Sequence, residues 1–103
     1  RGLGDVYNRQ RSYSLSENYP NPFNPSTTFS YFTPEEGHVV IDIFNINGQR
    51  VKTYSSGNKI SGKRSIQWNG KDEKGLKLES GIYLYTMNIE GRVVDTKKML
   101  LIK

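Results

Sequence analysis

The sequence predicts an all-β fold, a sandwich of about seven antiparallel strands in two sheets. Two observations predict it. Ten glycines, four prolines and frequent β-branched residues favour strands and turns over helices. From Thr27 onward, alternating or short apolar runs are broken by turn residues at short intervals, which is typical of β-sandwiches.

The chain of 103 residues is long enough for one domain with a single modest core. Residues 1–17 show no clear periodicity and are predicted to be a linker or arm, so the sandwich is predicted over 18–103. The start is polar, without a signal-peptide core or an initiator Met. We therefore expect the sequence to be a fragment of a longer protein.

Turn residues divide the apolar runs into strands, and "PEEG" at 34–37 is the first predicted turn. "IEGR" at 89–92 is expected to be a tight turn between the last two strands. Residues 76–78 are the candidate for a seventh strand. The other six strands are predicted at 27–32, 38–45, 49–54, 64–68, 82–89 and 93–102.

The turn around Gly48 decides a register. A two-residue turn would pair Ile43 with Lys52, whereas a three-residue loop at 46–48, with Gly48 left-handed, would pair Ile43 with Val51. A slip by one residue would turn the apolar face of the preceding strand outward. We prefer the three-residue loop.

The stretch "NYPNPFNPSTTFSYF" leads into the first predicted strand. Pro20, Pro22 and Pro25 exclude a helix or a central strand and push the residues before them toward extended geometry. The stretch should be stiff and extended, and it should plant Tyr19 or Phe23 against the sandwich, where prolines cover a sheet edge.

Catalytic chemistry is not predicted. His38 is the single histidine, the carboxylates lie mostly in turns or on outer faces, and there is no cysteine. No Ser–His–Asp order, zinc-ligand spacing or phosphate-binding loop is present. We expect a domain that is not an enzyme and that holds no cofactor.

The loop "WNGKDEKG" contains side chains that are potential metal ligands. Asn69, Asp72 and Glu73 could offer oxygens to Ca²⁺, but their spacing does not match a calcium loop and Lys71 and Lys74 would repel a cation. A turn in which Asn and Asp side chains bond to their own backbone is favoured.

The charge pattern argues against nucleic acid and against a membrane span. The net charge is +5, but the basic residues are scattered and no block of five like charges occurs. No apolar run approaches the roughly 20 residues that a membrane-spanning helix needs.

"LESGIYLY" at 78–85 resembles the tyrosine corner of Greek-key sandwiches, with Tyr83 as the candidate and Tyr85 and Met87 on the same face. Trp68 is expected to be the core anchor from the opposing sheet, and a sugar-stacking role for it is the alternative. These features place the fold among immunoglobulin-like or fibronectin-like β-sandwiches.

Four stretches in order resemble a known family: "NYPNPFNPST", "VVIDIFNINGQRV", "IQWNGKDEKGLKLESGIYLY" and "TKKMLLIK". They are similar to the type A C-terminal sorting domain of type IX secretion cargo from Bacteroidetes and neighbouring phyla. They are also similar to the immunoglobulin-like domain of flagellar hook-capping proteins, a related group. The resemblance covers residues 16–103.

The resemblance implies an address label at the end of a secreted cargo protein. Such a domain folds in the periplasm, is recognised by the outer-membrane type IX secretion machinery, and is usually removed by a sortase-like peptidase, so that the cargo reaches the cell surface or is released. The implied partners are that machinery, the peptidase and the upstream cargo domain. Open strand edges would also allow a weak homodimer.

The resemblance also assigns motif positions. One departure is mild: Asn45 and Asn47 stand around the central turn in place of a more usual Asp and a larger residue. By position alone, the cleavage site is expected in the arm 1–17. The motifs fall on Asn18, Tyr19, Pro20, Asn21, Pro22 and Phe23, on Gly48 with Val51 after it, on Gly81 and Tyr83, and on Lys97, Lys98, Met99, Leu100, Leu101, Ile102 and Lys103.

A second hypothesis is an accessory β-sandwich of a secreted glycoside hydrolase or similar enzyme, acting as a spacer or a carbohydrate-binding module. A binding module would need two or three exposed aromatic side chains on one face. The alternation of aromatic and polar residues instead predicts that most aromatic side chains point inward.

Overall fold

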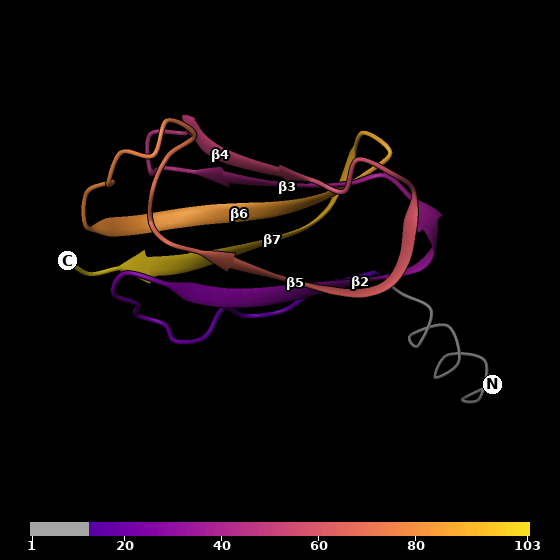
Figure 1. Ribbon diagram of the computed structural model, residues 1–103, viewed down its shortest axis with the longest axis horizontal. Coiled ribbons are helices and arrows are strands. Elements are labelled where there is room, and N and C mark those ends of the chain that lie inside the picture. Colours follow the sequence, from indigo (N-terminus) through magenta and orange to yellow (C-terminus); the bar gives the residue numbers. More distant parts are fainter. Residues whose placement is uncertain (1–12) are drawn as a thin grey trace.

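A computed structural model describes residues 13–103, which form seven β-strands and no helix (Figure 1). Residues 13–103 therefore contain no helix that could cross a membrane. The strands are β1 (Ser14–Leu15), β2 (Thr27–Gly37), β3 (Val39–Phe44), β4 (Arg50–Ser55), β5 (Ile60–Trp68), β6 (Gly81–Ile89) and β7 (Arg92–Leu101).

The strands form two sheets, one with the order β1-β2-β5 and one with the order β4-β3-β6-β7. All strand pairs are antiparallel. The two sheets lie face to face as two layers (Figure 1), which confirms the predicted sandwich.

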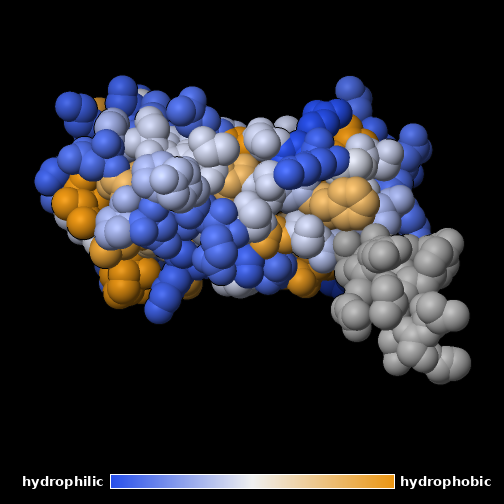
Figure 2. Space-filling model, turned by 90° about the horizontal axis from the view of Figure 1, so that it is seen from below, coloured by the Kyte–Doolittle hydropathy of each residue, from blue (hydrophilic) through white to orange (hydrophobic). Residues whose placement is uncertain are grey.

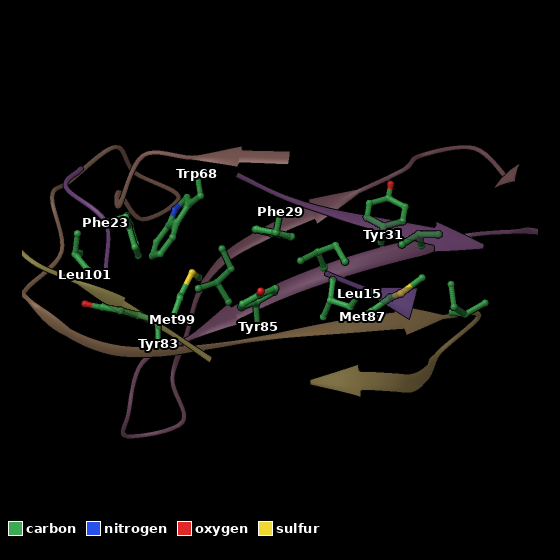
Figure 3. Packing of buried hydrophobic residues seen from close by; sticks show 14 of the residues in the cluster. Leu15, Phe23, Phe29, Tyr31, Trp68, Tyr83, Tyr85, Met87, Met99 and Leu101 are labelled. Carbon is green, nitrogen blue, oxygen red and sulfur yellow. The ribbon is translucent and has the colours of Figure 1, made fainter. Parts of the chain in front are cut away.

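The core follows from the two-residue period of a strand, because alternate side chains point to the same face. Val39, Ile41 and Ile43 of β3 are buried, and so are the alternate residues of β6 from Tyr83 to Ile89. The two sheets meet through aromatic contacts such as that of Phe29 with Tyr85, whose ring centroids are 4.4 Å apart (Figure 3).

The seventh strand is not where the sequence predicted it. Lys77 forms only an isolated bridge with Lys71, and the additional strand is β1, which lies within the range predicted to be a linker or arm. Leu15 of β1 is 4% exposed and belongs to the core, so the sandwich begins before residue 18. Residues 1–12 of the predicted arm lie outside the described residues.

The turn predicted at 34–37 is also wrong. Strand β2 continues to Gly37 with an irregularity after Thr33, and His38 alone separates it from β3 in the other sheet. The Thr33 hydroxyl donates a 2.6 Å hydrogen bond to the Glu35 carbonyl, which supports the bent backbone. The proline therefore marks a bend at which the chain changes sheets.

The turn around Gly48 is partly as predicted. Gly48 is left-handed with φ 85°, and its N–H donates to the Asn45 carbonyl, as the three-residue loop requires. Phe44 pairs with Arg50 in that register, but a bulge then shifts it, so that Ile43 pairs with Lys52 and not with Val51. The expected tight turn at Glu90–Gly91 is confirmed.

The connections divide the sandwich into two ends. The first, which we call the motif end, carries the segments 16–26, 45–49 and 69–80 and the residues after β7; it lies on the left in Figure 1. The second, the crossover end, carries three short connections among residues 13–103: His38, the segment 56–59 and the pair Glu90–Gly91.

Candidate recognition surface

Phe23 closes the motif end. Its side chain is 2% exposed, and its ring centroid lies 5.7 Å from that of Trp68 (Figure 3). Its N–H donates to the Leu100 carbonyl (3.0 Å), and its carbonyl accepts from the Ile102 N–H (2.9 Å). The segment therefore covers the edge of β7 with its backbone and plants Phe23 in the core, as expected. Tyr19 is 82% exposed.

Side-chain hydrogen bonds fix the segment before β2. The Asn18 Nδ2 donates to the Pro20 carbonyl (3.2 Å) and to the Thr27 Oγ1 (3.0 Å), and the Thr27 hydroxyl donates to the same carbonyl (2.8 Å). The chain bends at 20–22 and again at 24–25, so the expectation of an extended segment is wrong. The hydrogen bonds of Asn18 and Thr27, together with the proline rings, fix the conformation of this segment.

Buried and more exposed side chains alternate along the terminal motif, as expected for a strand with one face in the core. Met99 and Leu101 are buried, whereas Lys98, Ile102 and Lys103 are exposed. Lys97, half-buried, lies 3.6 Å from the Glu17 carboxylate by its Nζ.

Two further hydrogen bonds join the end of the chain to other segments. The Leu100 N–H donates to the Asn21 Oδ1 (3.0 Å), and the Lys103 N–H donates to the Ser80 Oγ (2.9 Å). The first and last motifs, about 80 residues apart, are thus one structural unit.

Tyr83 forms the predicted tyrosine corner. Its hydroxyl donates a 2.7 Å hydrogen bond to the Glu79 carbonyl, four residues upstream in the loop that enters β6. Burial raises the pKa of Tyr83, and the Glu79 charge raises it further, so the phenol remains a donor. The bond fixes the loop that leads into β6 at Gly81.

Trp68 is the predicted core anchor. It is 0% exposed, its ring centroid lies 5.6 Å from that of Tyr83, and its Nε1 donates to the Lys71 carbonyl (2.9 Å). A sugar cannot stack on a ring that is fully buried, so the alternative role is wrong. Trp68 instead supports the loop above it.

The loop after Trp68 is the predicted self-bonded turn. The Asp72 Oδ1 accepts from the N–H groups of Lys74 and Leu76, and the Asn69 Oδ1 accepts from the Lys71 N–H. Glu73 turns away toward β4, where its Oε2 accepts from the Thr53 N–H (2.7 Å). Residues 13–103 contain no group of three or more His, Asp or Glu side chains that could hold a metal ion.

Gly48, another predicted motif residue, does not contact the Phe23 segment or the terminal strand. It lies at the tip of the β3–β4 loop, with no atom within 4 Å of the position that a side chain would take. Asn45 holds this loop, since its Oδ1 accepts from the N–H groups of Asn47 and Gln49. The departure from Asp therefore leaves the turn intact, as expected.

The sequence analysis did not identify Glu79 and Ser80. The Glu79 carbonyl accepts the hydrogen bond of the Tyr83 hydroxyl, and the Ser80 Oγ accepts that of the Lys103 N–H. Their signal was present, because both directly precede the Gly-x-Tyr motif, where a tyrosine corner needs a loop acceptor.

An apolar strip borders Phe23's segment on the outer face of β6 and β7. Ile82, Leu84 and Ile102 are exposed there, and a shallow groove of about 330 Å³ runs between Pro22 and Lys98. Figure 2, which views the molecule from below, shows hydrophobic residues at the motif end as well as farther along the molecule. Exposed apolar side chains rimmed by polar groups are typical of interaction surfaces.

The FlgD Ig-like domain family matches residues 25–97. The chain belongs to this family. It is a family of immunoglobulin-like structural domains, which agrees with the sandwich described above. A comparison with curated proteins found no match.

Solved structures share the fold. PorU from Porphyromonas gingivalis, described as dimeric and latent, matches 88% of this chain with a TM-score of 0.72 and 24% identity. PorZ from the same organism, described as an essential surface component of the type-IX secretion system, matches 89% with a TM-score of 0.58 and 16% identity. FlgD from Xanthomonas campestris matches 87% with a TM-score of 0.59 and 23% identity.

These matches differ in how much of the other protein they cover. This chain spans 9% of the PorU chain, 12% of the PorZ chain and 67% of the FlgD chain. The fold therefore occurs as a small part of much larger proteins as well as in FlgD, and the likeness establishes the fold alone.

Proposed function

We propose that this domain is a C-terminal sorting signal that directs a cargo protein across the outer membrane through the type IX secretion system. The observation that carries the proposal is the motif end, where the Phe23 segment, the Gly-x-Tyr corner and the terminal strand form one hydrogen-bonded unit. The fold shared with PorZ, a component of that system, supports the same proposal.

In this proposal the secretion machinery recognises exposed side chains and not a free backbone edge of a sheet. At the motif end, the backbone edge of β7 is already paired with Phe23, and the edge of β4 is engaged by Glu73. A partner therefore meets exposed Lys98, Ile102 and Lys103 next to Pro22. Mixed cationic and apolar side chains on a rigid strand make a surface that a receptor can recognise without unfolding the domain.

The route follows from this role. The domain folds in the periplasm, is read at the outer membrane, and is then cut off by a sortase-like peptidase, so the cargo ends at the cell surface or in the medium. The cleavage point lies upstream of the folded sandwich in this proposal. The strand β1 is part of that sandwich, which favours a cut before Ser14.

The accessory-module hypothesis has less support. Among residues 13–103, Tyr19 is the one aromatic residue that is largely exposed, and Trp68 is buried. A carbohydrate-binding face with several stacking rings is therefore not formed by this part of the chain.

The test is a secretion assay. The chain is fused behind a fluorescent protein that carries an inner-membrane export signal and is expressed in a bacterium with type IX secretion. The variant Lys98→Glu with Ile102→Asp changes two exposed side chains of the terminal motif. Its matched control is Lys59→Glu with Val93→Asp, at exposed positions near the crossover end.

We expect fluorescence outside the cell for the parent and the control, and retention in the periplasm for the motif variant. A variant lacking 97–103 should also be retained, but it loses buried Met99 and Leu101 and so tests folding as well. Equal secretion of the motif variant and the control, or periplasmic retention of the parent, would overturn the proposal.

A further inference from the structure

A groove of about 580 Å³ opens at the motif end, on the other side of the Phe23 segment from the apolar strip. Its walls are the segment 24–25, the loop residues 69–71 and 77–78, and the end of the chain at Leu101 and Lys103. This volume lies within the range of about 300–1,000 Å³ that is usual for ligand sites. We propose that the groove binds an acidic peptide segment with aliphatic side chains, supplied by a partner protein.

The floor of the groove is apolar. Pro25, half-buried Leu78 and buried Leu101 form it together with Gly70. A side chain at Gly70 would come within 3.3 Å of the Pro25 carbonyl oxygen and 3.5 Å of the Leu101 methyl groups. The glycine therefore lets the loop approach the proline segment closely, and the remaining space is open to an aliphatic side chain of a ligand.

The charged side chains that line the groove are all cationic. They are Lys71, Lys77 and Lys103, and no acidic side chain is part of the lining. Lys71 and Lys77 also form an antiparallel bridge, so their side chains lie opposite each other, an arrangement of like charges that is unfavourable by itself. Neither makes an ion pair with another residue of 13–103.

The third cation is only loosely held. The Lys103 Nζ lies 3.8 Å from a Glu79 carboxylate whose side chain is almost fully exposed, and such pairs are weak in water. A carboxylate of a ligand can therefore compete for Lys103 and, at the same time, relieve the repulsion between Lys71 and Lys77.

The lining selects the kind of anion. It contains no aromatic side chain, which argues against a stacked sugar, and no arginine, whose planar fork favours bidentate contacts to phosphate. Asn24 and Asn69 supply amide groups that can bond to a peptide backbone. Lysine charges above an apolar floor fit alternating acidic and aliphatic side chains.

The test is a binding measurement in solution with the whole chain. The probe is an acetylated, amidated hexapeptide of alternating Leu and Asp, and the control peptide has Asn in place of Asp. Trp68 is the single tryptophan, and its Nε1 bonds to the Lys71 carbonyl beneath the groove, so its fluorescence reports on occupancy. Fluorescence anisotropy of a labelled probe gives a second readout.

We expect saturable binding of the acidic peptide that weakens with salt, a change in Trp68 fluorescence, and no saturation with the Asn peptide. The variant Lys71→Glu with Lys77→Glu should weaken binding by about tenfold or more, because two favourable charge contacts become repulsive. Lys59→Glu with Lys63→Glu, the same change of net charge on exposed residues elsewhere, should leave it unchanged. If the first variant does not fold, Lys77→Glu alone, at an exposed position, gives the same comparison.

Equal losses in both double variants would show non-specific attraction and overturn the proposal. Inorganic pyrophosphate that binds more tightly than the peptide would also overturn it, by showing a phosphate site. Because Lys71 and Lys77 lie outside the terminal motif, this site and the sorting signal can fail independently.

Discussion

The two ends of the sandwich are closed in different ways. At the crossover end, strands are joined by very short connections: His38 alone links β2 to β3, and Glu90–Gly91 links β6 to β7. At the motif end, the segments 16–26 and 69–80 are long and irregular. Their order comes from hydrogen bonds between side chains and backbone groups, some within the same loop and some between distant segments.

This difference shows where specificity can reside. A short turn leaves few side chains free to vary, whereas long loops on a rigid sandwich present many, which is why loops commonly carry function. The family-like motifs lie at the end with the long loops, and Phe23, Trp68 and Tyr83 turn these loops into fixed structure.

The largest expected loss of stability follows from truncating Phe23, the buried side chain that closes the motif end. Phe23→Ala removes a fully packed ring from its contact with Trp68, and such truncations destabilise by about 3–5 kcal/mol. The matched control is Tyr19→Ala, an exposed aromatic of the same segment, which should change the free energy of unfolding little. Urea unfolding measures both.

A loss below about 1 kcal/mol for Phe23→Ala would mean that the segment can detach without disturbing the core. The two ends would then not differ as described, because the order of the motif end would not depend on Phe23.

The core strands were predictable because apolar and polar residues alternate along each strand, and this local pattern determines which side chains are buried. Val39, Ile41 and Ile43 are each separated by one residue, so the sequence identified the strand and its inner face. The left-handed Gly48, the tyrosine corner and the Asp72 turn were predictable for the same reason, since each depends on neighbours within a few residues.

What was missed depends on distant partners. A two-residue strand, Ser14–Leu15, carries no periodic signal and exists because it pairs with Phe32 and Tyr31. The bulge that moves Ile43 to Lys52 reflects how β4 fits beside β3. The contact of Asn21 with Leu100 cannot be read from either stretch alone.

A smaller effect is expected from the tyrosine corner. Tyr83→Phe keeps the packing on Trp68 but removes the 2.7 Å hydrogen bond to the Glu79 carbonyl. We expect a loss of about 0.5–1.5 kcal/mol in the free energy of unfolding, typical for one such bond. Tyr54→Phe is the control, because that hydroxyl bonds to no other residue of 13–103.

Hydrogen exchange would sharpen the result. The amides of the loop 78–82 should exchange faster in Tyr83→Phe than in the parent, while those around Glu90 should not change. Uniform acceleration at both ends would instead indicate a global loss of stability and no local role for the corner.

The smallest effect is expected at the crossover end, where the closing contact is an exposed charge. The His38 backbone N–H donates a 2.8 Å hydrogen bond to the Glu90 Oε2, and this bond, more than any nearby charge, lowers the pKa of Glu90 from its usual 4.5. Because the carboxylate is the form that accepts the bond, its contribution is complete above the usual pKa and is lost as the pH falls through the lowered one.

Glu90→Gln should therefore have a lower unfolding free energy than the parent near neutral pH, and the difference should shrink as the pH falls below about 4.5. Glu36→Gln, an exposed carboxylate at the same end, is the control and should show no such convergence. A difference for Glu90→Gln that stays constant with pH would mean that ionisation of Glu90 is not linked to folding. The crossover end would then depend on the geometry of its short turns alone, and the charge would contribute nothing to closing it.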